Sequence, residues 1–143
     1  MRWKIKNREE LLSYGCRQSR RVVLDITDSV LKELDAYGRI RSILKCEGNL
    51  LKIGERCWDL SKKRHVYLIG AGKACNAMAM AVEDALGDRL TDGIAVVKIL
   101  EPEDRFVRTR VRIGGHPIPN QDGYEACLEI LDLIDHAAEE DLF

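Results

Sequence analysis

The sequence predicts an α/β fold built on an open sheet of mainly parallel strands, with helices and a small β-hairpin before it. Three observations support this prediction. A compact apolar run over residues 66–69 turns through Gly70-Ala71-Gly72 into a helical pattern. A second apolar run, 94–97, follows that helix, so residues 66–99 form one βαβ unit with parallel strands. An alternating segment over residues 106–113 then adds another strand before a final helix.

Length and charge narrow the range of functions. A chain of 143 residues suits one domain with its own core. Its 23 basic and 24 acidic side chains give a net charge of −1, so no overall field would attract nucleic acid or a membrane surface. The five cysteines include no CxxC pair, and the N-terminus lacks the apolar core of a signal peptide. We therefore expect a cytoplasmic protein with free thiols and no membrane span.

The first part of the chain is predicted to be helical. We divide the single domain into a helical lead-in, 1–48, and a sheet-forming part, 49–143. Asn7 followed by Glu10 has the form of a capping box, and Gly15 would end this short helix.

A longer helix should follow, because apolar residues recur at helical spacing over residues 19–37 before Gly38. Residues 40–44 suggest one more short helix. We expect these opening helices to pack on the sheet as a structural appendage.

The elements around the central strand follow from turn residues and periodicity. Segments 50–53 and 56–60 predict a hairpin, because Gly54 can supply the positive φ of a tight turn. After the central strand, the apolar and mostly alanine face of residues 74–86, which includes Met78, predicts a helix lying close to the sheet.

The alternating strand over residues 106–113 has one basic face, formed by Arg108, Arg110 and Arg112. Charges on the outer face of a peripheral strand prevent unwanted edge pairing. We prefer this interpretation to a phosphate or nucleic-acid site because the overall charge is neutral.

The last helix is predicted to begin at a cap formed by Asn120 or Asp122. Its expected core face, within residues 124–134, includes Tyr124 and Leu128. The final residues, 141–143, resemble the start of another parallel strand, which an α/β chain normally forms after a crossover helix.

The strand-to-helix turn is the main functional candidate. Such a turn directs unpaired backbone N–H groups and the positive end of the helix dipole at one point, which suits an anion. A lysine in the first helical turn opposes the dipole and is better tolerated with an anion bound. We therefore predict that Lys73 holds an anion, with Gly70, Ala71, Gly72 and Ala74 as the anion-binding turn. No residue is assigned to a metal.

Neither common nucleotide fingerprint fits this turn. For the P-loop, Tyr67 replaces the first glycine and Ala74 replaces the hydroxyl residue that holds magnesium, so a conventional P-loop is excluded. For the dinucleotide motif, the third glycine is replaced by Cys75. The candidate acidic residue, Glu101, lies farther along than the usual spacing of about 20 residues.

A second loop adds His116 to the candidate site. It follows the end of another strand, and the loops after the carboxyl ends of parallel strands meet at one edge of a sheet. Lys73 and His116 should therefore face one cleft. Packing beneath the proline loop is an equally good interpretation of His116.

Three motifs together resemble a known family. They are Val-Tyr-Leu-Ile-Gly-Ala-Gly-Lys-Ala at 66–74, Asp-Gly-Ile-Ala-Val-Val-Lys at 92–98 and Gly-Gly-His-Pro-Ile-Pro-Asn at 114–120. In this order they resemble the Rossmann-like N-terminal domain of the MOFRL-type glycerate 2-kinases, which are often labelled hydroxypyruvate reductases. The resemblance implies phosphorylation of D-glycerate to 2-phosphoglycerate with ATP and Mg²⁺. It also implies that Lys73 is the active-site lysine.

The resemblance also implies that this chain is an incomplete domain. In the family, Asp-Leu leads into a further strand, a Ser-Gly-Gly-rich phosphate loop and a second domain with a catalytic arginine. We therefore expect no kinase activity from residues 1–143 alone. Two alternatives stay open: an NAD(P)-dependent, hydroxypyruvate reductase-like domain, and a non-catalytic remnant or interaction module. The remnant or interaction module predicts a homo-oligomer or other pairing through the unfinished sheet edge.

Overall fold

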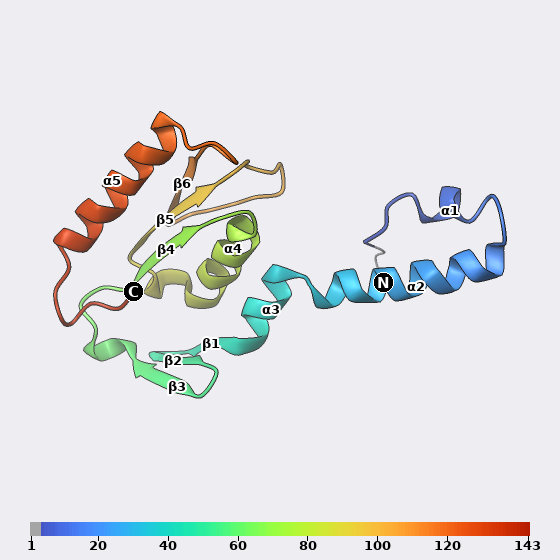
Figure 1. Ribbon diagram of the computed structural model, residues 1–143. Coiled ribbons are helices and arrows are strands. Elements are labelled where there is room, and N and C mark those ends of the chain that lie inside the picture. Colours follow the sequence, from blue (N-terminus) through green and yellow to red (C-terminus); the bar gives the residue numbers. More distant parts are fainter. Residues whose placement is uncertain (1–3) are drawn as a thin grey trace.

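The computed structural model describes residues 4–143 and consists of an α/β body with a helical arm (Figure 1). Residues 1–3, part of the N-terminal stretch that lacks a signal-peptide pattern, lie outside the described range. Within the described range, no helix combines the length and apolar character needed to cross a membrane.

The body is organised around a parallel sheet in the order β4-β5-β6. Its strands are β4 (Tyr67–Ala71), β5 (Asp92–Val97) and β6 (Thr109–Ile113), and both neighbouring pairs are parallel. Helix α4 (Cys75–Leu86) connects β4 to β5, with a short 3₁₀ turn at Gly87–Arg89. The predicted βαβ unit is therefore confirmed.

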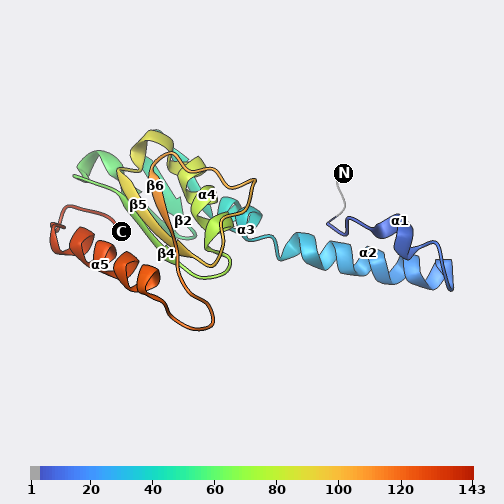
Figure 2. The same ribbon diagram turned by 90° about the horizontal axis from the view of Figure 1, so that it is seen from above.

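The C-terminal residues return to the sheet beside the start of β4. Helix α5 (Gln121–Asp135) and α4 lie on opposite faces of the sheet (Figures 1 and 2). After α5, Leu142 forms a parallel bridge with Val66, and its N–H donates to the His65 carbonyl at 2.9 Å. The predicted start of a further parallel strand is thus confirmed, on the side of β4 opposite β5. This is the order of an open, doubly wound sheet.

An ion pair holds this returning segment in place. The Arg64 guanidinium donates to both carboxylate oxygens of Asp141, at 2.9 and 2.6 Å. The Asp141 side chain is buried, and the hydrogen bonds from Arg64 lower the pKa of Asp141 to about 2. Two parallel N–H···O bonds of this kind are strong and geometrically specific.

A second, antiparallel sheet packs below α4 in the order β1-β2-β3. The predicted hairpin is confirmed as β2 (Leu50–Ile53) and β3 (Arg56–Asp59), followed by a 3₁₀ turn at Leu60–Lys62. Strand β1 (Leu44–Glu47) was not predicted, and the expected helix over residues 40–44 ends at Ile43 instead. Burial of Leu44 beside Leu51, in contact with α4, favours the strand over another helical turn.

Helix α4 packs on the sheet through small residues, as predicted, but its buried face is not wholly apolar. Ala79 and Ala81 are buried, and Ala79 joins Ala95 and Val97 in the core between helix and sheet. Asn76 and Glu83 are also buried, whereas Met78, predicted on the core face, is 41% exposed. Both polar side chains have hydrogen-bond partners, which is why the face tolerates them.

The arm consists of α1 (Arg8–Leu11) and α2 (Arg17–Glu33), and α3 (Ala36–Ile43) joins it to the body. The prediction of a single helix that ends at Gly38 is wrong, because two helices, α2 and α3, occupy this region. Asp35 interrupts it, because its carboxylate accepts a hydrogen bond from the Gly38 N–H at 2.9 Å and begins α3. The predicted capping box of α1 is also wrong, since the Asn7 side chain makes no capping bond.

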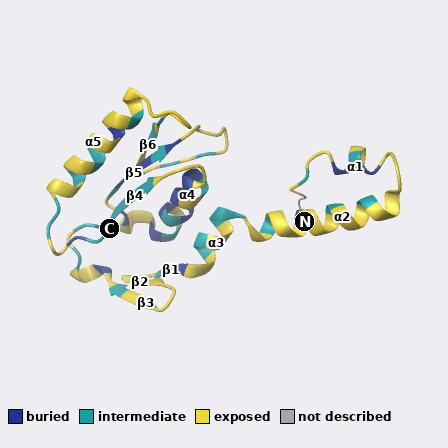
Figure 3. Ribbon diagram, in the orientation of Figure 1, coloured by how far each residue is buried: buried dark blue, intermediate teal, exposed yellow. Residues whose placement is uncertain are grey.

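Of the opening helices, only α3 packs on the body as predicted. Helix α3 lies against α4, but α2 extends away from the sheet (Figures 1 and 2). The apolar face of α2 therefore remains largely exposed (Figure 3), with Ile26 60% exposed.

The predicted core face of α5 is displaced. Tyr124 and Leu128 are exposed, and the sheet-facing stripe consists instead of Ala126, Glu129, Ile130 and Leu133. This stripe contains a glutamate because Glu129 pairs with arginines of β6. Because Glu129 interrupts the apolar spacing, hydrophobic periodicity did not identify this packed face.

Candidate functional site

The candidate residues of two separate loops meet in one pocket of about 200 Å³. The pocket lies at the carboxyl ends of the three parallel strands, where open α/β sheets bind ligands. It is lined by Ala71, Gly72, Lys73, Val96, Val97, Lys98, Gly114, Gly115 and His116. The structure therefore brings Lys73 and His116 together, as expected from the parallel strands.

The turn between β4 and α4 leaves two backbone donors free. Gly72 has a φ of 125°, which only glycine adopts without strain, and its N–H donates to the Val96 carbonyl at 3.0 Å. Lys73 precedes the N-cap residue Ala74, so it lies just before the helix and not in its first turn as predicted. The N–H groups of Lys73 and Ala74 donate to no described residue. They are the donors that this helix end can offer to an anion.

Gly70 and Ala74 do not line the pocket. A Cβ atom at Gly70 would lie 2.6 Å from the Cys75 Sγ, so this glycine allows α4 to approach β4 closely. Cys75 is buried in that contact, and burial raises the pKa of its thiol. Gly70 and Cys75 therefore act in packing, and the thiol is poorly placed to react.

The loop that carries His116 is held by Asn120. The Asn120 side-chain oxygen accepts from the Gly115 N–H at 2.7 Å and from the Gly123 N–H at 3.0 Å. One side chain thus caps α5 and closes the loop, which confirms Asn120 as the predicted cap. The His116–Pro117 peptide bond in this loop is cis.

The start of β6 is anchored to α4 by Glu83. Its carboxylate accepts from the Thr109 hydroxyl at 2.6 Å, from the Thr109 N–H at 3.1 Å and from the Arg108 N–H at 2.9 Å. It also accepts from the Val107 N–H. Burial alone would raise the pKa of Glu83, but these hydrogen bonds keep it below its ordinary value. This contact fixes the strand that leads to the His116 loop.

Lys98 is a pocket residue that sequence reasoning missed. It follows directly after Val97, at the carboxyl end of the central strand β5. The available signal was its position, because a charged residue immediately after a buried parallel strand lies at the ligand-binding edge of the sheet.

The three arginines of this region, Arg108 just before β6 and Arg110 and Arg112 within it, differ from the pocket lysines in having partners. Arg108 pairs with Asp88 at 2.6 Å, Arg110 with Asp92 at 2.8 Å, and Arg112 with Glu129 at 2.9 Å. The Arg112 guanidinium holds the pKa of Glu129 below its ordinary value. These arginines therefore pair with acidic residues of α5, of β5 and of the 3₁₀ turn after α4. Neither Lys73 nor Lys98 pairs with any acidic side chain in residues 4–143.

Comparison with known proteins identifies the family. Residues 22–143 match the family described as Domain of unknown function (DUF4147). The chain belongs to this family. It is 29% identical over 123 residues to a glycerate 2-kinase from Pyrococcus horikoshii, and 30% identical over 76 residues to a D-glycerate 2-kinase from Thermotoga maritima. These alignments cover 86% and 53% of this chain but 27% and 18% of the relatives, so the chain spans only about a quarter of their length or less.

A solved structure agrees with the fold. A crystal structure of a protein from Pyrococcus horikoshii OT3 matches with a TM-score of 0.71 at 30% sequence identity. The match covers 85% of this chain and 27% of that one. The resemblance to the glycerate 2-kinase family and the incomplete Rossmann-like α/β fold, both predicted from sequence, are therefore confirmed.

The pocket of this family member fits a phosphate or carboxylate better than a metal ion. Its lining offers two ammonium groups, an imidazole and backbone N–H groups, all of which suit anions. Mg²⁺ prefers carboxylate and phosphate oxygens, and none of the lining residues is acidic. The residues present therefore do not fit Mg²⁺. Glu101, the candidate acid of a dinucleotide site, does not line the pocket either.

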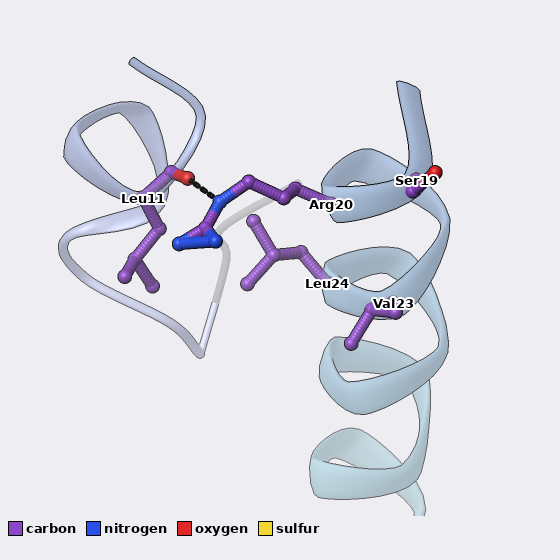
Figure 4. A pocket seen from close by; sticks show the side chains of 5 residues that line it. All are labelled: Leu11, Ser19, Arg20, Val23 and Leu24. Carbon is purple, nitrogen blue, oxygen red and sulfur yellow. Dashed lines mark hydrogen bonds between the residues drawn. The ribbon is translucent and has the colours of Figure 1, made fainter. Parts of the chain in front are cut away.

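A cavity of about 280 Å³ lies in the arm between α1 and α2 (Figure 4). Ser19 and Arg20 are its polar lining residues, and the Arg20 Nε donates to the Leu11 carbonyl at 2.6 Å. The guanidinium also stacks over Tyr14, 4.0 Å from the ring centroid. The arginine is thus already engaged and the remaining lining is mostly apolar, so we assign no chemistry to this cavity.

Proposed function

We propose that this chain forms the anion-binding wall of a glycerate 2-kinase active site, which transfers a phosphoryl group from ATP to the 2-hydroxyl of D-glycerate. One observation carries the proposal. Lys73, without an acidic partner in residues 4–143, lines the same pocket as His116 at the carboxyl edge of the parallel sheet. The names of two relatives, glycerate 2-kinase and D-glycerate 2-kinase, support the same reaction.

The chemistry of phosphoryl transfer suits this arrangement. Such transfer depends on positioning and charge neutralisation more than on covalent catalysis. Lys73 provides a positive charge, and its free backbone N–H provides a donor in the pocket just before the N-terminus of α4. Lys73 therefore neutralises either the carboxylate of D-glycerate or the phosphoryl group during transfer. His116 can donate a hydrogen bond to the same ligand or accept one from it.

A binding experiment tests this proposal on the chain itself. The ¹⁵N-labelled protein is titrated with D-glycerate, 2-phosphoglycerate, ATP and NADH, and amide shifts are followed by NMR. D-glycerate or ATP should shift the amides of Lys73, Ala74 and Gly115 in a saturable way. Lys73→Met should weaken this binding about tenfold, since one charge-assisted contact is lost.

Lys52→Met is the matched control, because Lys52 is exposed on β2 and lies outside the pocket. It should bind like the wild type. Saturable binding of NADH without any response to ATP or D-glycerate would overturn the kinase proposal in favour of the reductase alternative.

A further inference from the structure

Lys98 occupies a central position in the pocket. Strand β5 lies between β4 and β6, so Lys98 at its end is flanked by the Lys73 turn and by the His116 loop. Two backbone hydrogen bonds extend the sheet into these loops: Gly72 N–H to the Val96 carbonyl at 3.0 Å, and Gly114 N–H to the Val97 carbonyl at 2.9 Å. The strand end that carries Lys98 is therefore held on both sides.

The segment after Lys98 is also fixed. The Asn76 side chain, which is 9% exposed in the first turn of α4, donates to the Ile99 carbonyl at 2.9 Å and to the Asp104 carboxylate. The same carboxylate accepts from the Glu101 N–H at 2.8 Å. The Asp104 carboxylate is thus engaged by hydrogen bonds from Asn76 and from the loop backbone, and Lys98 has no ion-pair partner among the described side chains.

We infer that Lys98 is a second anion-binding residue, and that the pocket takes a small acid carrying both a carboxylate and a phosphate, one group at each lysine. This inference rests on the proposed function, which uses Lys73 alone. Two ammonium groups at neighbouring strand ends repel each other, and a ligand with two anionic groups removes that repulsion.

Three probes separate the roles of the two lysines. Dissociation constants of D-glycerate, inorganic phosphate and 2-phosphoglycerate are measured by NMR titration for the wild type, Lys73→Met, Lys98→Met and the control Lys52→Met. Lys98→Met should weaken the binding of 2-phosphoglycerate about tenfold. It should also weaken the binding of one of the two probes with a single anionic group, D-glycerate or inorganic phosphate. Lys73→Met should weaken the binding of 2-phosphoglycerate and of the other probe with a single anionic group.

The outcomes distinguish the two proposals. If Lys98→Met binds all three probes like the wild type while Lys73→Met binds weakly, the inference about Lys98 is overturned and the proposed function stands. If Lys73→Met also binds like the wild type, the proposed function fails as well. Lys98 is exposed, so its replacement should leave the amide spectrum of the core unchanged. Lys98→Gln serves as a second neutral variant, and Lys98→Arg should retain 2-phosphoglycerate binding.

Discussion

Helices α2 and α4 both carry apolar side chains at helical spacing, yet only α4 is buried by the rest of the chain (Figure 3). The residues of α4 that pack on the sheet include Cys75 and Ala79, and small side chains there allow close contact. The face of α2 presents Val23, Ile26 and Val30 to solvent. Periodicity therefore shows which face of a helix is apolar, but it does not show whether this chain covers that face.

The largest effect should come from a matched pair of isoleucines. Ile94 on β5 is fully buried, whereas Ile26 on α2 is 60% exposed. Ile94→Ala should lower the free energy of unfolding by about 2–5 kcal/mol, because it removes buried methyl groups and leaves a cavity. Ile26→Ala should change it by less than about 0.5 kcal/mol. Urea denaturation followed by circular dichroism measures both, and equal effects would show that α2 is covered in solution.

The same contrast explains which parts of the structure the sequence could predict. The βαβ unit was predictable because Gly70 and Gly72 mark a sharp turn between two unambiguous apolar runs. The break at Asp35 was not predictable, because the apolar pattern continues through it. The helix ends there because the Asp35 side chain caps the next helix. The face of α5 was misjudged because Glu129, a charged residue, faces the sheet in order to pair with Arg112.

The candidate site was predictable to a similar degree. Lys73 and His116 could be placed in one pocket because parallel strands bring their carboxyl ends to one edge. Lys98 was missed because its signal is only its position, directly after the buried apolar run 94–97. Only the strand order, with β5 at the centre, places it between the other two loops.

A second prediction compares glutamates in the two helices. Glu83 in α4 is buried and accepts hydrogen bonds from the start of β6, while Glu33 ends α2 and is exposed. Glu83→Ala should lower the free energy of unfolding by about 1–3 kcal/mol, since it leaves buried N–H groups without an acceptor.

Glu33→Ala should have almost no effect on stability. Hydrogen exchange should also quicken at Thr109 in the Glu83 variant alone. Unchanged exchange at Thr109 would contradict the anchoring role of Glu83.

A third prediction depends on pH and concerns the returning segment. The pKa of Asp141 falls from an ordinary value of 3.8 to about 2 because of its hydrogen bonds with Arg64. A lowered carboxylate pKa stabilises the folded state above pH 3.8, and this contribution is lost as the pH falls towards 2. The stability advantage of the wild type over Asp141→Asn should therefore shrink across this window. An equal advantage at pH 7 and at pH 2 would contradict the assignment.

The contact between Arg64 and Asp141 also has a kinetic consequence. It joins residues 77 positions apart, so a long loop must close before the ion pair forms. Contacts of such separation are slow to form. If this one forms after the rate-limiting step, its loss accelerates unfolding more than it slows folding. The lifetime of the folded body would then depend on three residues, 141–143, that contribute little to how quickly it assembles.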